Sequence, residues 1–140
     1  MRTYAVREGM IPSAKLELFE RLRADVEAMP DVEPSDAVSC HAVCRALEIR
    51  HPGAVCVDGF FHAVGHEHSW LDLGDGIIAD MYPIGGVTPF MVDASSWMIP
   101  WTRIYIRKDD LLDGRRPRRA VHDGMASRLV AALREVALAP

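Results

Sequence analysis

The residues best suited to chemistry in this sequence are a histidine, a tryptophan and an aspartate in one short segment. His68 and Trp70 come first, and Asp80 follows beyond a glycine-containing break. A carboxylate that reaches an imidazole fixes its tautomer and stabilises its charged form, which general acid–base catalysis requires. We therefore predict that His68 and Asp80 form a catalytic pair and that Trp70 binds substrate beside them.

The sequence around the loop 74–76 predicts a β-hairpin of defined register. Both flanking segments alternate apolar and polar residues, as strands with one buried face do. A three-residue loop pairs Trp70 with Asp80, which then lies diagonally from His68 at about 7–8 Å along the backbone. A slip by one residue would bring charge onto the apolar face, so burial selects this register. The core face consists of Leu71, Leu73, Ile77, Ala79 and Met81, and the opposite face carries His68, Trp70, Asp80 and Tyr82, the last a second predicted substrate-binding residue.

The predicted nucleophile for this pair is Cys40. A helix is expected over 39–50, and with Ser39 as its cap Cys40 lies in the first turn, where the helix dipole favours a thiolate. In that arrangement His68 takes and returns the thiol proton while Asp80 holds the imidazole. The chain contains neither asparagine nor glutamine, so the third member of a triad has to be an aspartate or a glutamate.

The other thiols receive different predictions. Cys44 lies one turn beyond Cys40 on the same helix face and is a second candidate nucleophile, although Cys40 is nearer the helix start. Cys56 falls in an apolar strand and is expected in the core. An odd number of cysteines without an export signal indicates reduced thiols, so we expect a cytoplasmic protein.

Together these motifs resemble the transglutaminase-like branch of the papain-fold cysteine enzymes. The resemblance rests on Cys40 at a helix start, on His68-Ser69-Trp70 in one strand, and on Gly76-Ile77-Ile78-Ala79-Asp80 in the next. The helix motif Cys44-Arg45-Ala46-Leu47 is also similar to bacterial members that cleave leader peptides from small ribosomal peptides. The chain departs from the family in having no recognisable oxyanion donor ahead of Cys40.

The resemblance implies a cysteine hydrolase or acyltransferase with a Cys–His–Asp triad. Such an enzyme acts on an amide or ester bond, as a peptidase, deamidase or acyltransferase, through a thioacyl intermediate on Cys40. Its substrate is a peptide or another amide-bearing molecule, and no cofactor or metal is expected.

Two alternative functions fit the same residues. Cys40, Cys44, His66 and His68 are ligand types that zinc accepts, so the chain could be a metal-binding domain in which Asp80 orients a histidine. It could also be a catalytically inactive relative that binds a peptide in the same groove. Stoichiometric zinc in the purified protein would favour the first alternative, and an unreactive Cys40 thiol the second.

The helices and strands predicted from the sequence, which must position these residues, indicate an α+β fold in one domain, 1–140. Helical spacing of apolar residues predicts helices over 13–29, 39–50 and 117–137, the second with a buried stripe of Ala42, Val43, Ala46 and Leu47. Strands are predicted over 54–61, 66–73, 77–82 and 102–108. The order, N-terminal helices, an antiparallel sheet and a C-terminal helix, is that expected of a papain- or transglutaminase-like core.

The composition excludes several classes of partner. The 140 residues carry a net charge of −4, so no overall positive field attracts nucleic acid or anionic lipid. No apolar run approaches the roughly 18 residues that cross a bilayer. We expect no nucleic-acid or membrane partner.

Overall fold

The computed structural model describes residues 11–29, 40–62, 67–81, 88–95, 101–107 and 120–138. Two helices, α1 (Ser13–Ala28) and α2 (Cys40–Arg50), precede the strands β1 (Val55–Phe61), β2 (Glu67–Asp72), β3 (Ile77–Asp80) and β4 (Phe90–Asp93). A short helix α3 (Trp101–Ile104) leads into β5 (Tyr105–Arg107), and α5 (Ala120–Leu138) follows. The predicted α+β class and its order of helices and strands are confirmed.

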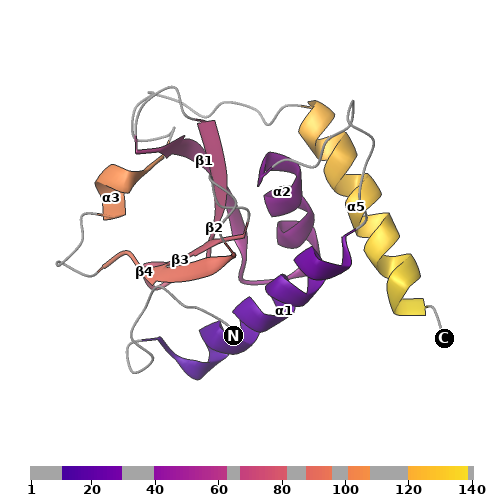
Figure 1. The fold of residues 1–140 in the computed structure, drawn as a ribbon, viewed down its shortest axis with the longest axis horizontal. Coiled ribbons are helices and arrows are strands. Elements are labelled where there is room, and N and C mark those ends of the chain that lie inside the picture. The colour runs from indigo at the N-terminus through magenta and orange to yellow at the C-terminus, as the bar shows by residue number, and fades with distance from the viewer. Residues whose placement is uncertain are drawn as a thin grey trace.

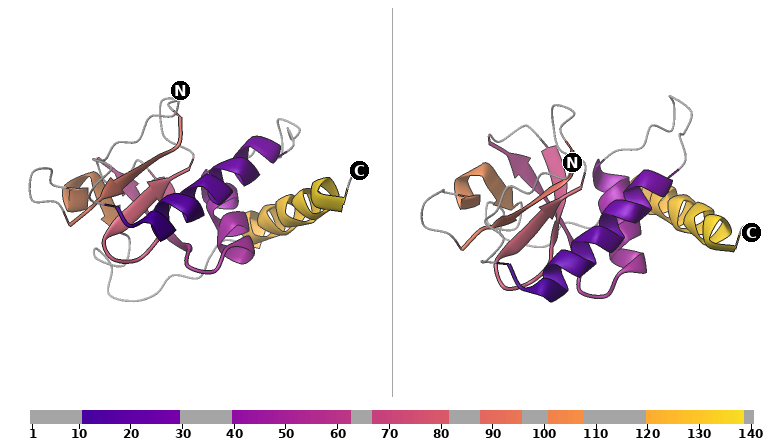
Figure 2. Two further views of the ribbon diagram at one scale, coloured as in Figure 1. Left: turned by 90° about the horizontal axis from the view of Figure 1, so that it is seen from below. Right: turned by 60° about the horizontal axis from the view of Figure 1, so that its bottom comes forward.

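The strands form one five-stranded antiparallel sheet in the order β4-β3-β2-β1-β5. Figure 1 shows α2 between this sheet and α5, with α1 crossing beside them. The two further views in Figure 2 place α1, α2 and α5 on one side of the sheet and α3 on the other. The helix that begins at Cys40 is therefore enclosed by the sheet on one side and by a second helix on the other.

The central hairpin has the register predicted from the sequence. Leu71 pairs with Ala79 and Asp72 with Ile78 across the antiparallel ladder. Positive φ angles at Gly74, Asp75 and Gly76 close the loop, and two of these three residues are glycines, which adopt such angles without steric cost. The predicted core strip is confirmed, since all of its members are buried in one cluster with α1 and α2: Leu71, Leu73, Ile77, Ala79 and Met81.

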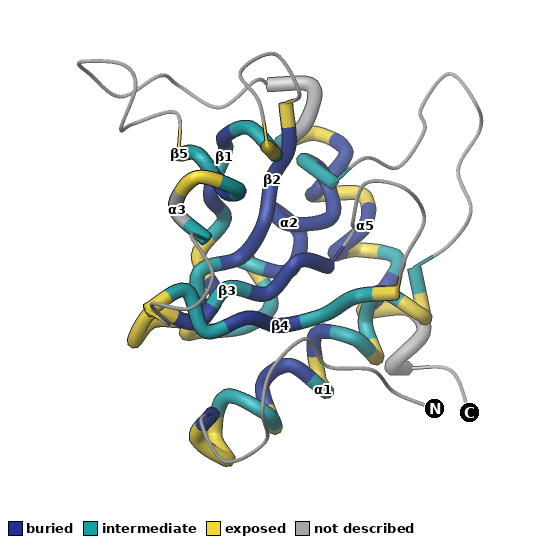
Figure 3. Tube along the Cα trace, turned by 60° about the vertical axis from the view of Figure 1, so that its left-hand side comes forward, coloured by how far each residue is buried: buried dark blue, intermediate teal, exposed yellow. Residues whose placement is uncertain are grey.

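The opposite face of the hairpin is also buried. The central strand β2 is covered on both sides, as its colouring in Figure 3 shows. Trp70 and Tyr105 belong to a second apolar cluster on this face, together with Val57 and Val92. His68 and Asp80 are therefore buried and not displayed to solvent.

The last part of the sheet differs from the prediction. A strand was expected over 102–108, but the strand is confined to Tyr105–Arg107 and follows a helical turn. Trp101 and Ile104, at helical i,i+3 spacing, both pack against the second cluster. The sequence also gives no strand signal for Phe90–Asp93, which forms the edge strand β4 beside β3.

Replacing Gly59 with alanine is expected to destabilise the fold next to the candidate site. Gly59 pairs with His68 across β1 and β2, and a Cβ at Gly59 would collide with the Trp70 ring and with the carbonyl oxygen of Ile106. Because one of these neighbours is backbone, we expect a loss of about 1–3 kcal/mol in the free energy of unfolding, the usual cost of overpacking. Urea unfolding, monitored by circular dichroism, measures this loss in the free energy of unfolding.

The matched control is the same substitution at Gly124, where an added Cβ meets nothing within 4 Å. Gly124 lies inside α5, so alanine there should raise stability by about 0.5–1 kcal/mol. Equal effects at both positions would show that Gly59 is not a close-packing site.

Among the described residues, no helix combines the length and apolarity needed to cross a membrane.

Candidate active site

The predicted His68–Asp80 contact is present and fully enclosed. Nε2 of His68 lies 3.0 Å from each carboxylate oxygen of Asp80. The hydroxyl of Tyr105 donates a second hydrogen bond of 2.8 Å to Oδ2 of Asp80. Burial, and the negative charge of Asp80, raise the pKa of Tyr105, so its proton remains available for this bond. The hairpin brings His68 and Asp80 together, and β5 supplies a third member.

Aromatic rings surround this pair. The rings of Phe61 and Trp70 lie 5.7 and 6.2 Å from the His68 ring, and Trp70 packs edge-on against Tyr105 at 5.1 Å. His68 is 0% and Asp80 1% exposed, so their polar contacts are with each other and, for Asp80, also with Tyr105. Trp70 is also only 1% exposed, a burial that gives no support to its predicted contact with substrate.

Cys40 begins α2 and has an unusually acidic thiol. Burial by itself would raise its pKa, but interactions with His41 and His68, and with the backbone N–H of Ser69, lower the pKa to about 6. Cys40 is partly exposed. An acidic cysteine that is not fully buried and that interacts with imidazoles is in the environment of a reactive thiol.

The pKa of His68 is raised, whereas that of Cys40 is lowered. Burial would lower its pKa, but Asp80 and then the Cys40 thiolate raise it to about 9. Its second ring nitrogen, Nδ1, is buried and has no hydrogen-bond partner among the described residues. Near neutral pH the favoured state is therefore a Cys40 thiolate beside a His68 imidazolium.

The other two cysteines lack these features. Cys44 is 0% exposed, and its contact with Cys56, its burial and nearby negative charges raise its pKa well above the ordinary value. Cys56 is partly exposed in β1 and packs at the edge of the main core cluster. Of the two candidate thiols on α2, Cys40 has the properties of a nucleophile and Cys44 those of a core residue.

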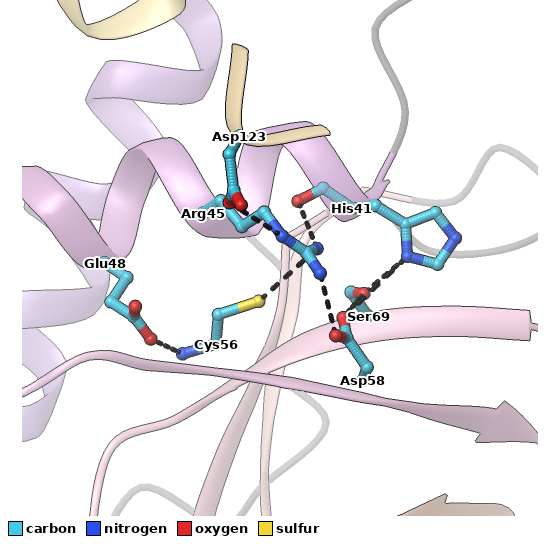
Figure 4. A network of polar contacts seen from close by, with 7 residues as sticks. All are labelled: His41, Arg45, Glu48, Cys56, Asp58, Ser69 and Asp123. Carbon is cyan, nitrogen blue, oxygen red and sulfur yellow. Dashed lines mark hydrogen bonds and ion pairs between the residues drawn. The ribbon is translucent and has the colours of Figure 1, made fainter. Parts of the chain in front are cut away.

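A second polar network begins at the residue after Cys40, as Figure 4 shows. Nδ1 of His41 lies 2.6 Å from the hydroxyl of Ser69, which donates a 2.6 Å hydrogen bond to Asp58. The guanidinium of Arg45 donates to Asp58 at 2.8 Å, and it also pairs with Asp123 of α5 at 3.4 Å. This network links α2, β1, β2 and α5 at the start of the helix that carries Cys40.

Five members of these contacts are not singled out by the sequence analysis: His41, Asp58, Ser69, Tyr105 and Asp123. The signal for His41 is its position directly after Cys40, and Ser69 lies inside the His68-Ser69-Trp70 motif. Tyr105 gives no such signal, because its contact with Asp80 depends on the pairing of β5 with β1.

Some predicted residues lie outside the part of the chain that the structure describes. These are the helix cap Ser39, the substrate-binding candidate Tyr82 and the metal-ligand candidate His66. Among the described residues, no three histidine, cysteine, aspartate or glutamate side chains are grouped so that they could hold a metal ion.

Comparisons with known proteins identify no family for this chain. No protein-family model matches the chain, and no curated protein or solved structure is significantly similar to it. The interpretation of the site therefore depends on its own geometry and chemistry.

Alkylation by iodoacetamide is expected to modify Cys40 with a midpoint near pH 6. The thiolate is the reactive form, so the rate rises with pH through the pKa of about 6 and levels off above it. The rate at each cysteine is measured by mass spectrometry of peptides. Cys44 serves as the internal control and should stay unmodified over this range, because it is buried and less acidic. A Cys40 midpoint near the unperturbed value of about 8.5 would contradict the prediction.

Proposed function

We propose that this chain is a cysteine-dependent acyl-transfer enzyme that acts on an amide or ester through a thioacyl intermediate on Cys40. The observation that carries the proposal is the buried His68 imidazole, which Asp80 holds at 3.0 Å and whose charge is coupled to the acidic thiol of Cys40. A nucleophile, a proton carrier and a group that orients the carrier are the parts that such chemistry requires. The transglutaminase-like resemblance of the three sequence motifs supports the same proposal.

The proposed reaction begins from the thiolate–imidazolium pair. The Cys40 sulfur attacks the carbonyl carbon and forms a C–S bond, while the carbonyl electrons move onto oxygen. When they return, the bond to the leaving group breaks, and an amine leaving group takes the proton from His68. Water or an amine then gives a proton to His68 and forms a bond to the thioester carbonyl carbon. When this second tetrahedral intermediate collapses, the C–S bond breaks and its electron pair returns to sulfur, which restores the Cys40 thiolate beside the His68 imidazolium. Water as acceptor gives hydrolysis, and an amine gives acyl transfer.

Asp80 and Tyr105 have supporting parts in this proposal. Asp80 accepts the Nε2–H of His68, so that Nδ1 is the nitrogen that exchanges the proton. Because the Tyr105 hydroxyl donates to Asp80, it limits rotation of the carboxylate. A buried imidazolium needs such a partner, since an uncompensated charge in an apolar site is strongly unfavourable.

An activated ester tests the proposal because it needs no specific amine leaving group. Incubation with p-nitrophenyl acetate should release a burst of one nitrophenolate per chain and leave one acetyl group on Cys40, detected by intact-protein and peptide mass spectrometry. The variant Cys40→Ser should show neither the burst nor the modified peptide. Cys56→Ser, which removes another partly exposed thiol, should behave like the wild type.

Amide and ester substrates should also differ in their dependence on pH. Acylation by both should rise through the Cys40 pKa of about 6. Only an amide should lose rate as pH rises through the His68 pKa of about 9, because an amine leaves as a protonated group and nitrophenolate does not. Absence of any acylated Cys40, or stoichiometric zinc in the purified protein, would exclude the proposed enzyme.

A further inference from the structure

The imidazole of His68 has one polar partner and two aromatic neighbours. Both carboxylate oxygens of Asp80 contact its Nε2 at 3.0 Å, whereas its Nδ1 has no hydrogen-bond partner among the described residues. An imidazole held at one nitrogen can swing about that contact unless other side chains confine it. The rings of Phe61 and Trp70 lie 5.7 and 6.2 Å from the His68 ring. The orientation of His68 therefore depends on these rings as well as on Asp80.

Of these two rings, Phe61 is the one that borders solvent. Trp70 is 1% exposed, whereas Phe61 is partly exposed at the edge of the second apolar cluster. His68 and Asp80 are 0% and 1% exposed. The Phe61 side chain thus has one part against a fully buried imidazole and another part in contact with water.

Phe61 also contacts the second group that hydrogen-bonds to Asp80. Its ring meets the Tyr105 ring edge-on, with centroids 5.4 Å apart, and the Tyr105 hydroxyl donates to Oδ2 of Asp80 at 2.8 Å. One ring therefore packs against both partners of the carboxylate. Water that reached Asp80 would compete for these hydrogen bonds and screen the negative charge that holds His68.

The backbone fixes Phe61 in this place. Phe61 lies opposite Tyr105 in the β1–β5 ladder, so their side chains share one face of the sheet. The next residue, His62, has a φ of 65°, which is unfavourable for any residue other than glycine. Its N–H donates to the carbonyl of Ile104 at 2.7 Å, and its ring packs edge-on against Phe61 at 4.6 Å. Such strain is kept only where surrounding contacts enforce it, often beside functional sites.

We propose that Phe61 is a positioning residue of the active site, whose ring keeps water away from Asp80 and so holds the His68 imidazole in the orientation for proton exchange at Nδ1. This inference rests on the proposed function. In this role Phe61 touches neither the substrate nor the reacting sulfur. It acts through His68 and Tyr105, whose contacts with Asp80 it protects.

The titratable groups that face His68 come from several elements. Burial lowers the pKa of His68, but Asp80 on β3 and Cys40 on α2 raise it to about 9. Tyr105 on β5 shares the Asp80 carboxylate with His68, and His62 packs against the Phe61 ring. Water beside the pair would weaken the effect of burial and that of the charges together. Without Phe61, the pKa of His68 should therefore fall toward its ordinary value of 6.5.

The first experiment measures how fast water reaches the proton between His68 and Asp80. In protein labelled with ¹⁵N-histidine, the Nε2–H of His68 should give an NMR signal at neutral pH, because a buried hydrogen-bonded proton exchanges slowly. Its absence in His68→Gln assigns the signal. Phe61→Ala should speed the exchange several-fold. The matched control is Phe60→Ala, since the adjacent side chain of β1 points to the opposite face of the sheet, and exchange there should equal that of the wild type.

The pH profile of kcat/KM for an amide provides a second readout. The alkaline fall of the activity, set by His68 near pH 9, should move down by about one pH unit in Phe61→Ala, the usual effect of weakening a nearby charge. Phe61→Leu restores apolar volume and should lie between Phe61→Ala and the wild type in both measurements. It also serves as the test if circular dichroism shows Phe61→Ala to be unfolded. A loss of folded protein alone would scale the rates without moving the profile.

The inference and the proposed function have distinguishable outcomes. If the His68 Nε2–H exchanges as slowly in the folded Phe61 variants as in the wild type, Phe61 does not shield the pair, whether or not Cys40 forms an acyl-enzyme. A wild-type protein without this signal would overturn the inference in the same way. If the exchange depends on Phe61 but no ester or amide acylates Cys40, the shielding of the pair stands and the acyl-transfer function is excluded.

Discussion

Replacing Asp80 with asparagine is expected to lower kcat/KM for an amide substrate by about 10³–10⁴-fold, the typical effect of removing the carboxylate from a triad. The carboxamide carries no charge, and its NH2 group must face the Nε2–H of His68 or the hydroxyl of Tyr105. Asp80 is also the main group that raises the His68 pKa to about 9. In Asp80→Asn the alkaline fall of the activity should therefore move to lower pH.

The measurement is a pH profile of kcat/KM, with Asp72→Asn as the matched control. Asp72 lies in the same hairpin, but its side chain is exposed and pairs with Arg107 at 3.5 Å. Its replacement should leave the profile unchanged. An Asp80→Asn variant that is folded and as active as the wild type would show that His68 does not act through Asp80.

Replacing Arg45 with alanine is expected to reduce the free energy of unfolding by about 1–3 kcal/mol, the cost of leaving a partly buried charged group without its hydrogen-bond partner. The Arg45 side chain is 3% exposed, and it bonds to Asp58, to Asp123 and to the carbonyl of His41. Without it, the Asp58 carboxylate loses its cation, and α2 loses an ion pair to α5. Urea unfolding with a linear extrapolation measures the change.

Arg23→Ala is the control for this effect. Arg23 pairs with Glu20 and Glu27 on the surface of α1, where such pairs contribute at most about 1 kcal/mol. The double variant Arg45→Ala/Asp58→Ala should be less destabilised than the sum of the two single variants, because the second change removes the unpaired charge. Simple additivity would indicate that the two side chains do not interact.

The hairpin could be predicted from the sequence because the residues that determine its faces and register are close together in the chain. Alternation sets the faces, the loop 74–76 sets the register, and together they place Asp80 against His68. Which thiol lies near this pair was also predictable in outline, since a helix start favours an acidic cysteine. The sequence favours Cys40 over Cys44 only through its place nearer the helix start, and the packing of α2 adds a second difference by burying Cys44 completely.

The remaining contacts depend on pairings between distant segments. Tyr105 reaches Asp80 only because β5 joins the sheet beside β1, and a strand of three residues leaves little pattern in the sequence. Likewise, Asp58 meets His41 only after α2 packs over β1 and β2. Burial of the polar face of the hairpin was not predicted either, since alternating strands usually leave that face in water.

The placement of α2 between the sheet and α5 has a consequence for when the thiol becomes reactive. His41, one of the groups that make Cys40 acidic, is its neighbour in the sequence, but His68 and the backbone N–H of Ser69 belong to β2 and come near Cys40 only when the sheet packs against α2. In an unfolded or newly synthesised chain these groups are apart, and Cys40 is an ordinary thiol, mostly protonated at neutral pH. Its reactivity therefore appears together with the native state, so the rate of alkylation at neutral pH reports the fraction of molecules that have folded.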